Sequence, residues 1–125
     1  MIHEEICTYE LCKLAKEKGY PQHIGNDAYI VENVGCCYPI QFIPDYLPTI
    51  TAPTQSLLQR WLREEKVLHI QITLWDKGWY SDIWAFEYYE EEKEYFAKRL
   101  HQSTDLTSYE LALEDALKYA LENLI

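Results

Sequence analysis

Residues 53–89 read PTQSLLQRWLREEKVLHIQITLWDKGWYSDIWAFEYY, and this stretch decides the fold. Its first part, residues 53–66, predicts a helix. Pro53 suits the first helical turn, and Thr51 or Thr54 can cap it. The apolar side chains recur at helical spacing and form one face: Leu57, Leu58, Trp61 and Leu62.

A two-stranded hairpin follows this helix. Residues 67–75 alternate aliphatic and polar side chains, which is typical of a half-buried strand whose inward residues are Leu68, Ile70, Ile72 and Leu74. Residues 76–78 supply a turn, with Gly78 where a positive φ is expected, and residues 79–89 form the second strand. Trp75 and Trp79 flank the turn, where they can pair across the strands or form an exposed anchor for a partner.

The C-terminal part completes a helix–strand–strand–strand–helix unit. Residues 90–94 form a polar turn, and residues 95–101 are predicted as a third strand, with a helix as the alternative. Residues 102–106 are predicted as a loop. The last helix, residues 107–125, begins with a capping box in which Thr107 is the N-cap and Glu110 reaches back.

The N-terminal part adds smaller elements. Residues 4–18 are predicted as a helix with an apolar stripe of Cys7, Leu11, Leu14 and Ala15, and Gly19 follows as the C′ residue. Residues 27–34 and 36–38 indicate two short strands. Residues 39–52 are predicted as a Pro-rich connector, because prolines at intervals of four or five residues fit neither a helix nor a central strand.

These patterns predict an α+β fold. We expect an antiparallel sheet of three to five strands with the two main helices packed on one face, plus an N-terminal helix. A length of 125 residues is typical of one compact domain. Along the chain it divides into residues 1–38, 39–52 and 53–125.

The charge excludes some partners. Asp and Glu number 21 against 11 Lys and Arg, for a net charge of −10. Binding to nucleic acid or an anionic membrane needs gathered basic residues, so neither is expected. An acidic surface suits a basic protein partner, or serves solubility. The chain begins without the features of a signal peptide and has no long apolar run, so a cytoplasmic location with reduced cysteines is expected.

Four segments resemble a known group of proteins. They are ELCKLAKEKG at 10–19, PTQSLLQRWLRE at 53–64, LHIQI at 68–72 and TSYELALE at 107–114. They look like small uncharacterised proteins found in prophages and mobile elements of gut Bacteroidetes. The resemblance implies a protein of phage or mobile-element type, and it implies no activity and no site residues.

The predicted order of helices and strands resembles two known types of domain. The topology of residues 53–125 is that of a double-stranded RNA-binding domain, but such domains carry Lys at the start of the last helix. Glu110, Glu114 and Asp115 occupy that region here and would repel phosphate. Three strands followed by Thr-x-x-Glu and an Ala/Leu-rich helix also resemble antitoxins of the HicB type, which bind a basic toxin, although their Pro-rich motif is not evident.

Metal or covalent chemistry has little support in the spacing. The soft ligands are Cys7, Cys12, Cys36, Cys37, His3, His23, His69 and His101. No C-x-x-C pair occurs, and adjacent cysteines chelate tetrahedral zinc poorly. Cys36 or Cys37 with His23 or His69 remains an alternative as an enzyme or metal site. We expect no enzyme activity, no catalytic residues, no cofactor and no metal.

An acidic and aromatic stretch is the candidate contact surface. Glu87, Glu90, Glu91, Glu92 and Glu94 lie beside Tyr88, Tyr89 and Tyr95. A solvated turn is the simpler interpretation. The functional hypothesis is a non-enzymatic protein–protein interaction module for a basic partner, with a homodimer as a further option. Its predicted partner-binding residues are Trp75, Trp79, Tyr88, Tyr89, Glu90, Glu91 and Glu92.

Overall fold

The computed structural model of the chain describes residues 5–22, 28–31, 37–38, 49–76 and 78–125. The contacts divide the chain into two compact units, residues 1–58 and residues 59–125. The boundary lies within helix α2 (Gln55–Glu65). The sequence instead led us to expect one compact domain, with its last part beginning at residue 53.

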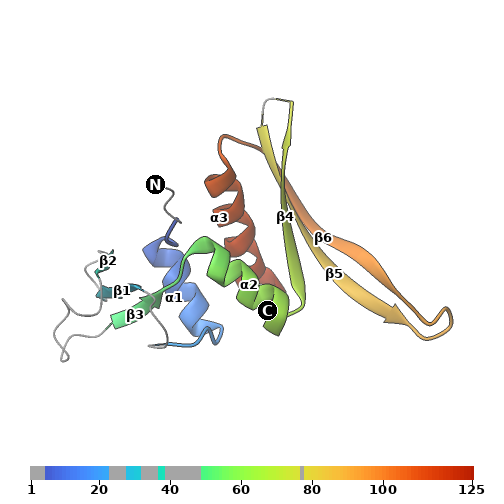
Figure 1. Cartoon of the computed structure of the whole chain (residues 1–125), viewed down its shortest axis with the longest axis horizontal. Helices are drawn as coiled ribbons and strands as arrows, with labels where there is room; N and C mark the ends of the chain where they lie inside the picture. Colours follow the sequence, from blue (N-terminus) through green and yellow to red (C-terminus); the bar gives the residue numbers. More distant parts are fainter. Residues whose placement is uncertain (1–4, 23–27, 32–36, 39–48, 77) are drawn as a thin grey trace. The chain divides into compact units, whose positions relative to one another are not determined.

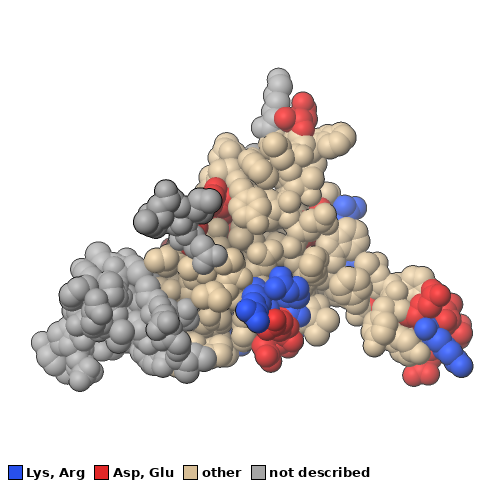
Figure 2. All heavy atoms as spheres, in the orientation of Figure 1, with Lys and Arg blue, Asp and Glu red and all other residues tan. Residues whose placement is uncertain are grey.

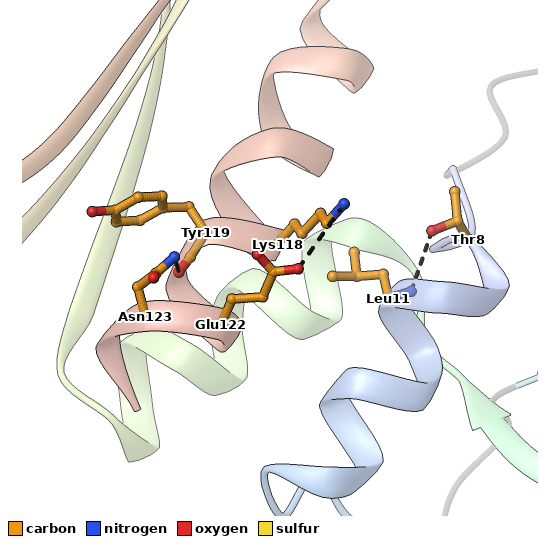
Figure 3. A network of polar contacts seen from close by, with 6 residues as sticks. All are labelled: Thr8, Leu11, Lys118, Tyr119, Glu122 and Asn123. Carbon is orange, nitrogen blue, oxygen red and sulfur yellow. Dashed lines mark hydrogen bonds and ion pairs between the residues drawn. The ribbon is translucent and has the colours of Figure 1, made fainter.

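The first unit contains helix α1 (Tyr9–Glu17). The Thr8 side chain caps it by accepting a hydrogen bond from Leu11 N at 3.3 Å (Figure 3). The predicted start at residue 4 is therefore wrong. Residues 5–8 are not helical because their backbone bonds elsewhere: Cys7 N donates to Pro53 O, and Gln55 N donates to Glu5 O. The predicted end is confirmed, since Gly19 has a φ of +100°.

A three-stranded antiparallel sheet in the order β2-β1-β3 lies in the same unit (Figure 1). Strands β1 (Ala28–Val31) and β2 (Cys37–Tyr38) confirm the two predicted short strands. Strand β3 (Thr49–Ala52) corrects the end of the predicted connector. Pro48 and Pro53 flank these four residues and leave their backbone donors intact, so the prolines did not prevent a strand here. The rest of the connector, residues 39–48, lies outside the described residues.

Helix α2 begins where the sequence indicated. Thr54 Oγ1 accepts a hydrogen bond from Leu57 N at 3.3 Å, which confirms Thr54 as a cap. The apolar face is narrower than predicted, because Leu58 and Leu62 are buried whereas Leu57 is exposed. Farther along the helix, Gln59 Nε2 donates to the carbonyl oxygen of Ile70 at 3.0 Å.

The second unit is built on an antiparallel sheet in the order β4-β5-β6 (Figure 1). Its strands are β4 (Leu68–Trp75), β5 (Gly78–Tyr89) and β6 (Glu94–Leu106). The helix alternative for residues 95–101 is therefore wrong, and so is the predicted loop at 102–106. That segment continues the ladder, with Ser103 opposite Ser81 and Leu106 opposite Trp79.

Helix α3 (Tyr109–Tyr119) follows and packs on all three strands before it ends in a π-helical turn, η2 (Ala120–Leu124). Figure 3 shows Asn123 Nδ2 donating to the Tyr119 carbonyl within that turn. The N-cap is Ser108 and not Thr107, since Ser108 Oγ accepts from Leu111 N at 3.1 Å. The buried face of α3 and η2 consists of Ala112, Leu113, Ala116, Leu117, Ala120 and Leu121.

The sheet turns one face toward α3, called here the helix-bearing face. Leu68, Ile70 and Ile83 are buried there, and the register places Ile70 directly opposite Ile83. This arrangement confirms the predicted α+β fold with helices on one face of an antiparallel sheet. Leu74 was predicted to point inward but is 58% exposed. It is the next-to-last residue of β4, near the β4–β5 turn, where the strands extend beyond the first turn of α3 (Figure 1).

Strand β6 carries one extra residue at Leu100. Ile83 pairs with His101, and the next residue of β5, Trp84, pairs with Arg99. This β-bulge changes the alternation, so His101 lies on the helix-bearing face and Arg99 on the opposite face. His101 stacks there on Tyr119 of α3, with ring centroids 3.5 Å apart.

Candidate functional site: the β5–β6 arm

Strands β5 and β6 extend farther than β4. The last pair between β4 and β5 is Leu68 with Ala85, whereas β5 and β6 stay paired as far as Tyr89 with Glu94. Residues 86–97 therefore form a two-stranded hairpin, here called the arm, which projects away from α3 (Figure 1). Its turn spans residues 90–93, with Lys93 at a φ of +53°.

Aromatic side chains occupy both faces of the arm. Five rings are between 42% and 72% exposed: Phe86, Tyr88, Tyr89, Tyr95 and Phe96. An isolated hairpin with two solvated faces cannot bury such rings against itself. Large exposed apolar groups gathered on one element are typical of contact surfaces.

The alternation of the strands sorts four of these five rings into two pairs. Tyr89 and Phe96 meet edge to face on the helix-bearing side, with ring centroids 5.1 Å apart and planes at 75°. Tyr88 and Tyr95 lie directly opposite each other on the other side, 4.9 Å apart. Each face of the arm therefore presents its own aromatic pair.

The arm is strongly acidic. Residues 86–97 contain five Glu and one Lys, which gives a net charge of −4. Figure 2 shows acidic atoms gathered at the tip of the arm, with basic atoms beside them. At its base, Lys98 Nζ lies 3.6 Å from Glu87 Oε1. A surface of one charge sign attracts cationic partners and raises their association rate.

Glu87 also holds the ring of Tyr89. The Tyr89 hydroxyl donates to Glu87 Oε2 at 3.0 Å. This hydrogen bond, together with the negative charge of Glu87, raises the pKa of Tyr89 above its ordinary value of 10.0. The hydroxyl of Tyr89 is thus directed along the strand to Glu87.

A shallow hollow of about 250 Å³ lies on the arm, lined by Tyr89, Glu92 and Phe96. Two of the lining residues are the edge-to-face rings, and the third is the acidic residue Glu92 of the turn. The hollow therefore combines apolar surface with one negative charge.

The structure brings together five of the seven predicted partner-binding residues. Tyr88 and Tyr89 lie on the arm, and Glu90, Glu91 and Glu92 form most of its turn. Trp75 ends β4 and Trp79 lies at the start of β5, so both are at the opposite end of β5 from the arm.

The predicted pairing of Trp75 with Trp79 is wrong. The short turn places Trp75 opposite Gly78 and Leu74 opposite Trp79, so the two indoles lie on opposite faces of the sheet. Trp79 instead contacts Tyr109 edge to face, with centroids 5.7 Å apart.

The seven predicted partner-binding residues omitted three rings of the arm, Phe86, Tyr95 and Phe96, although Tyr95 was noted beside the acidic stretch. The sequence did not show where the sheet narrows from three strands to two. A comparison of strand lengths could have found this, since residues 79–89 outnumber residues 68–75 and leave their far end without a partner in β4.

The alternative Cys/His site gains no support from the positions described. His69 pairs with Trp84 and His101 with Ile83, so these two imidazoles lie on opposite faces of the sheet. Cys7 and Cys12 are buried, and Cys12 Sγ donates to Cys7 O at 3.5 Å. His3, His23 and Cys36 lie outside the described residues, as does the Cys37 side chain. Among the side chains described, no three of His, Cys, Asp and Glu gather as a metal ligand set.

A polar cluster lies on the opposite face of the sheet from α3. Arg99 reaches Asp82 with Nη1 to Oδ1 at 3.5 Å, and its guanidinium lies 5.7 Å from the centre of the Trp84 ring. Asp82 is mostly buried although no helix of residues 59–125 covers this face in the described structure. The cluster ties β5 to β6 just below the arm.

Comparisons with protein-family models, with curated proteins and with solved structures returned no match. The resemblance to proteins of mobile elements therefore stays a prediction. None of the described helices combines the length and apolar character that crossing a membrane requires.

Proposed function

We propose that this protein is a non-enzymatic interaction module that docks a basic protein partner through the arm. The observation that carries the proposal is the coincidence of five exposed aromatic rings with a net charge of −4 on one projecting hairpin. Exposed aromatic rings supply contact area, and the charge selects a cationic surface. The resemblance to proteins of mobile elements is compatible with such a role and names no partner.

The charge also argues against two copies meeting arm to arm. Two arms of −4 would place like charges side by side, which opposes association. A basic partner instead lets the aromatic contacts and the electrostatic attraction act together.

The test is capture of a partner by the tagged full-length chain from a lysate, with two matched variants. Tyr95→Ser removes the most exposed ring of the arm, 72% exposed. Leu111→Ser removes an exposed apolar side chain from the first turn of α3, away from the arm. Captured proteins are identified by mass spectrometry, and their dependence on salt is measured.

The expected result is a protein of basic sequence that binds the wild type and Leu111→Ser, is lost from Tyr95→Ser, and is released by salt. Equal capture by Tyr95→Ser would contradict the proposal. A captured partner of acidic sequence, or one insensitive to salt, would contradict the electrostatic part of it.

A further inference from the structure

The hollow on the arm combines two kinds of recognition. Tyr89 and Phe96 form two walls at 75° to each other, and Glu92 adds a carboxylate from the adjoining turn. The π-face of an aromatic ring carries partial negative charge, so it attracts a cation placed within about 6 Å of its centre. An acidic residue beside two exposed aromatic rings therefore favours a positively charged ligand.

The same chemistry rejects other ligands. An anion would meet the carboxylate of Glu92, with Glu87 bonded to the hydroxyl of Tyr89. A bare metal ion needs several oxygen, nitrogen or sulfur ligands, whereas the hollow offers one carboxylate beside two rings. An alkylammonium group fits both the aromatic and the acidic side of the hollow, because its methylene stem packs on the rings while its charge approaches the carboxylate.

The angle between the rings favours lysine over arginine. A guanidinium is planar and stacks parallel to an aromatic face. Rings at 75° form a corner and not a parallel slot. A compact ammonium on a narrow stem fits such a corner without a preferred plane.

The corner is held in place before any ligand arrives. The Tyr89 hydroxyl donates to Glu87 at 3.0 Å, and Glu87 is in turn 3.6 Å from Lys98. Phe96 and Glu87 are directly opposite each other in the ladder, so the strand pairing sets the backbone position and the face of the second wall. The hydrogen bond to Glu87 reduces the side-chain freedom that Tyr89 loses on binding.

We infer that this hollow binds the side chain of a lysine presented by the basic partner. The inference rests on the proposed function and goes beyond it by naming the residue type that enters the arm and the three side chains that receive it.

The experiment uses a capped hexapeptide of alternating lysine and glycine as the probe, with the full-length chain at low salt. Binding is followed through the NMR signals of the Tyr89 and Phe96 rings. Glu92→Gln and Glu91→Gln change the net charge equally, but only Glu92 lines the hollow. Phe96→Leu tests a ring wall, and the same peptide with acetylated lysines tests the charge.

We expect the lysine peptide to shift both ring signals. Glu92→Gln and Phe96→Leu should each weaken binding about two- to fivefold, which corresponds to one exposed cation–π or charge contact. Glu91→Gln should weaken binding less than either, and the acetylated peptide should leave the ring signals unchanged.

Two results would overturn the inference. Equal weakening by Glu91→Gln and Glu92→Gln would mean that only the overall charge of the turn matters, and equal binding of the acetylated peptide would mean that no cation is recognised. Neither result touches the proposed function, which fails only if partner capture ignores the arm or if the captured partner is not basic and salt-sensitive.

Discussion

His101 of β6 stacks on Tyr119 at the end of α3, with ring centroids 3.5 Å apart and ring planes within 10° of parallel. The contact joins an edge strand to the helix at the residue where α3 passes into its π-helical turn. A π-helical turn is a local departure from regular helix, so a side-chain contact at that point helps to fix it.

The stacked pair predicts a loss of stability in His101→Ala. An aromatic pair contributes beyond its buried area, so we expect the free energy of unfolding to fall by about 1–2 kcal/mol in urea denaturation. His69→Ala is the control, because His69 is exposed on the opposite face of the sheet. An equal loss in both variants would show that the stacking contributes nothing.

The cap of α3 predicts different stability losses for substitutions at two neighbouring residues. Ser108→Ala removes the oxygen that accepts from Leu111 N and should cost about 1 kcal/mol. Thr107→Ala should change the unfolding free energy by less than about 0.5 kcal/mol. Thermal denaturation of the two variants checks this, and a larger loss in Thr107→Ala would return the cap to the position predicted from sequence.

Val67 joins α2 to β4 in a left-handed conformation, with a φ of +56°. A Cβ atom in this region costs about 1–2 kcal/mol, and a β-branched residue there is unusual. Because Val67 is 59% exposed, Val67→Gly relieves this strain with little loss of burial. After the entropy cost of glycine, we expect a net gain of up to about 1 kcal/mol in urea denaturation. Val67→Ala keeps the Cβ atom, and stability equal to that of the glycine variant would contradict the strain.

The hydrogen bond between Tyr89 and Glu87 predicts that the pKa of Tyr89 is raised in the folded protein. The bond needs the phenolic proton, so the pKa of Tyr89 in the folded state lies above 10.0. The contribution of this hydrogen bond to the free energy of unfolding is complete below pH 10. It is lost as the pH rises through the raised pKa of Tyr89 in the folded state.

Carbon-13 NMR of labelled tyrosines, followed as a function of pH, measures the pKa of Tyr89. We expect Glu87→Gln to lower the pKa of Tyr89 toward 10.0, because the hydrogen bond to a charged acceptor and the charge itself are both removed. Glu91→Gln should leave the pKa of Tyr89 unchanged. A Tyr89 pKa that is unaffected by Glu87→Gln would remove Glu87 as the cause.

Elements with a clear period were predictable from the sequence. The helical spacing around Leu58 and Leu62 located α2, and the alternation of Leu68 and Ile70 located β4. Both signals arise from the burial of one face, so the fold class followed from them.

Features set by backbone partners were not predictable in the same way. Residues 5–8 left the helical pattern because Glu5 and Cys7 bond to the backbone of residues 53–55. Residues 102–106 contain polar side chains that suggest a loop, yet their pairing with β5 makes them strand. The side-chain pattern carries no record of such pairings.

The candidate site was predicted by composition and completed by geometry. The run of Glu and Tyr drew attention to residues 88–92, but Phe96 entered the site only because the register sets it diagonally across from Tyr89. Trp75 and Trp79 were included because they are tryptophans that flank the β4–β5 turn, and the register separates them from the arm.

The extra residue at Leu100 lets Phe96 and His101 of β6 lie on the same face of the sheet. The turn at residues 90–93 dictates which side of β6 Phe96 occupies, and α3 dictates which side His101 occupies. With strict alternation, an odd separation of five residues would put these two rings on opposite sides. Leu100 absorbs the mismatch, so a chain shortened there by one residue would have to give up either the hollow or the contact with Tyr119. In β6, the number of residues is therefore as strict a constraint as the chemistry of the side chains.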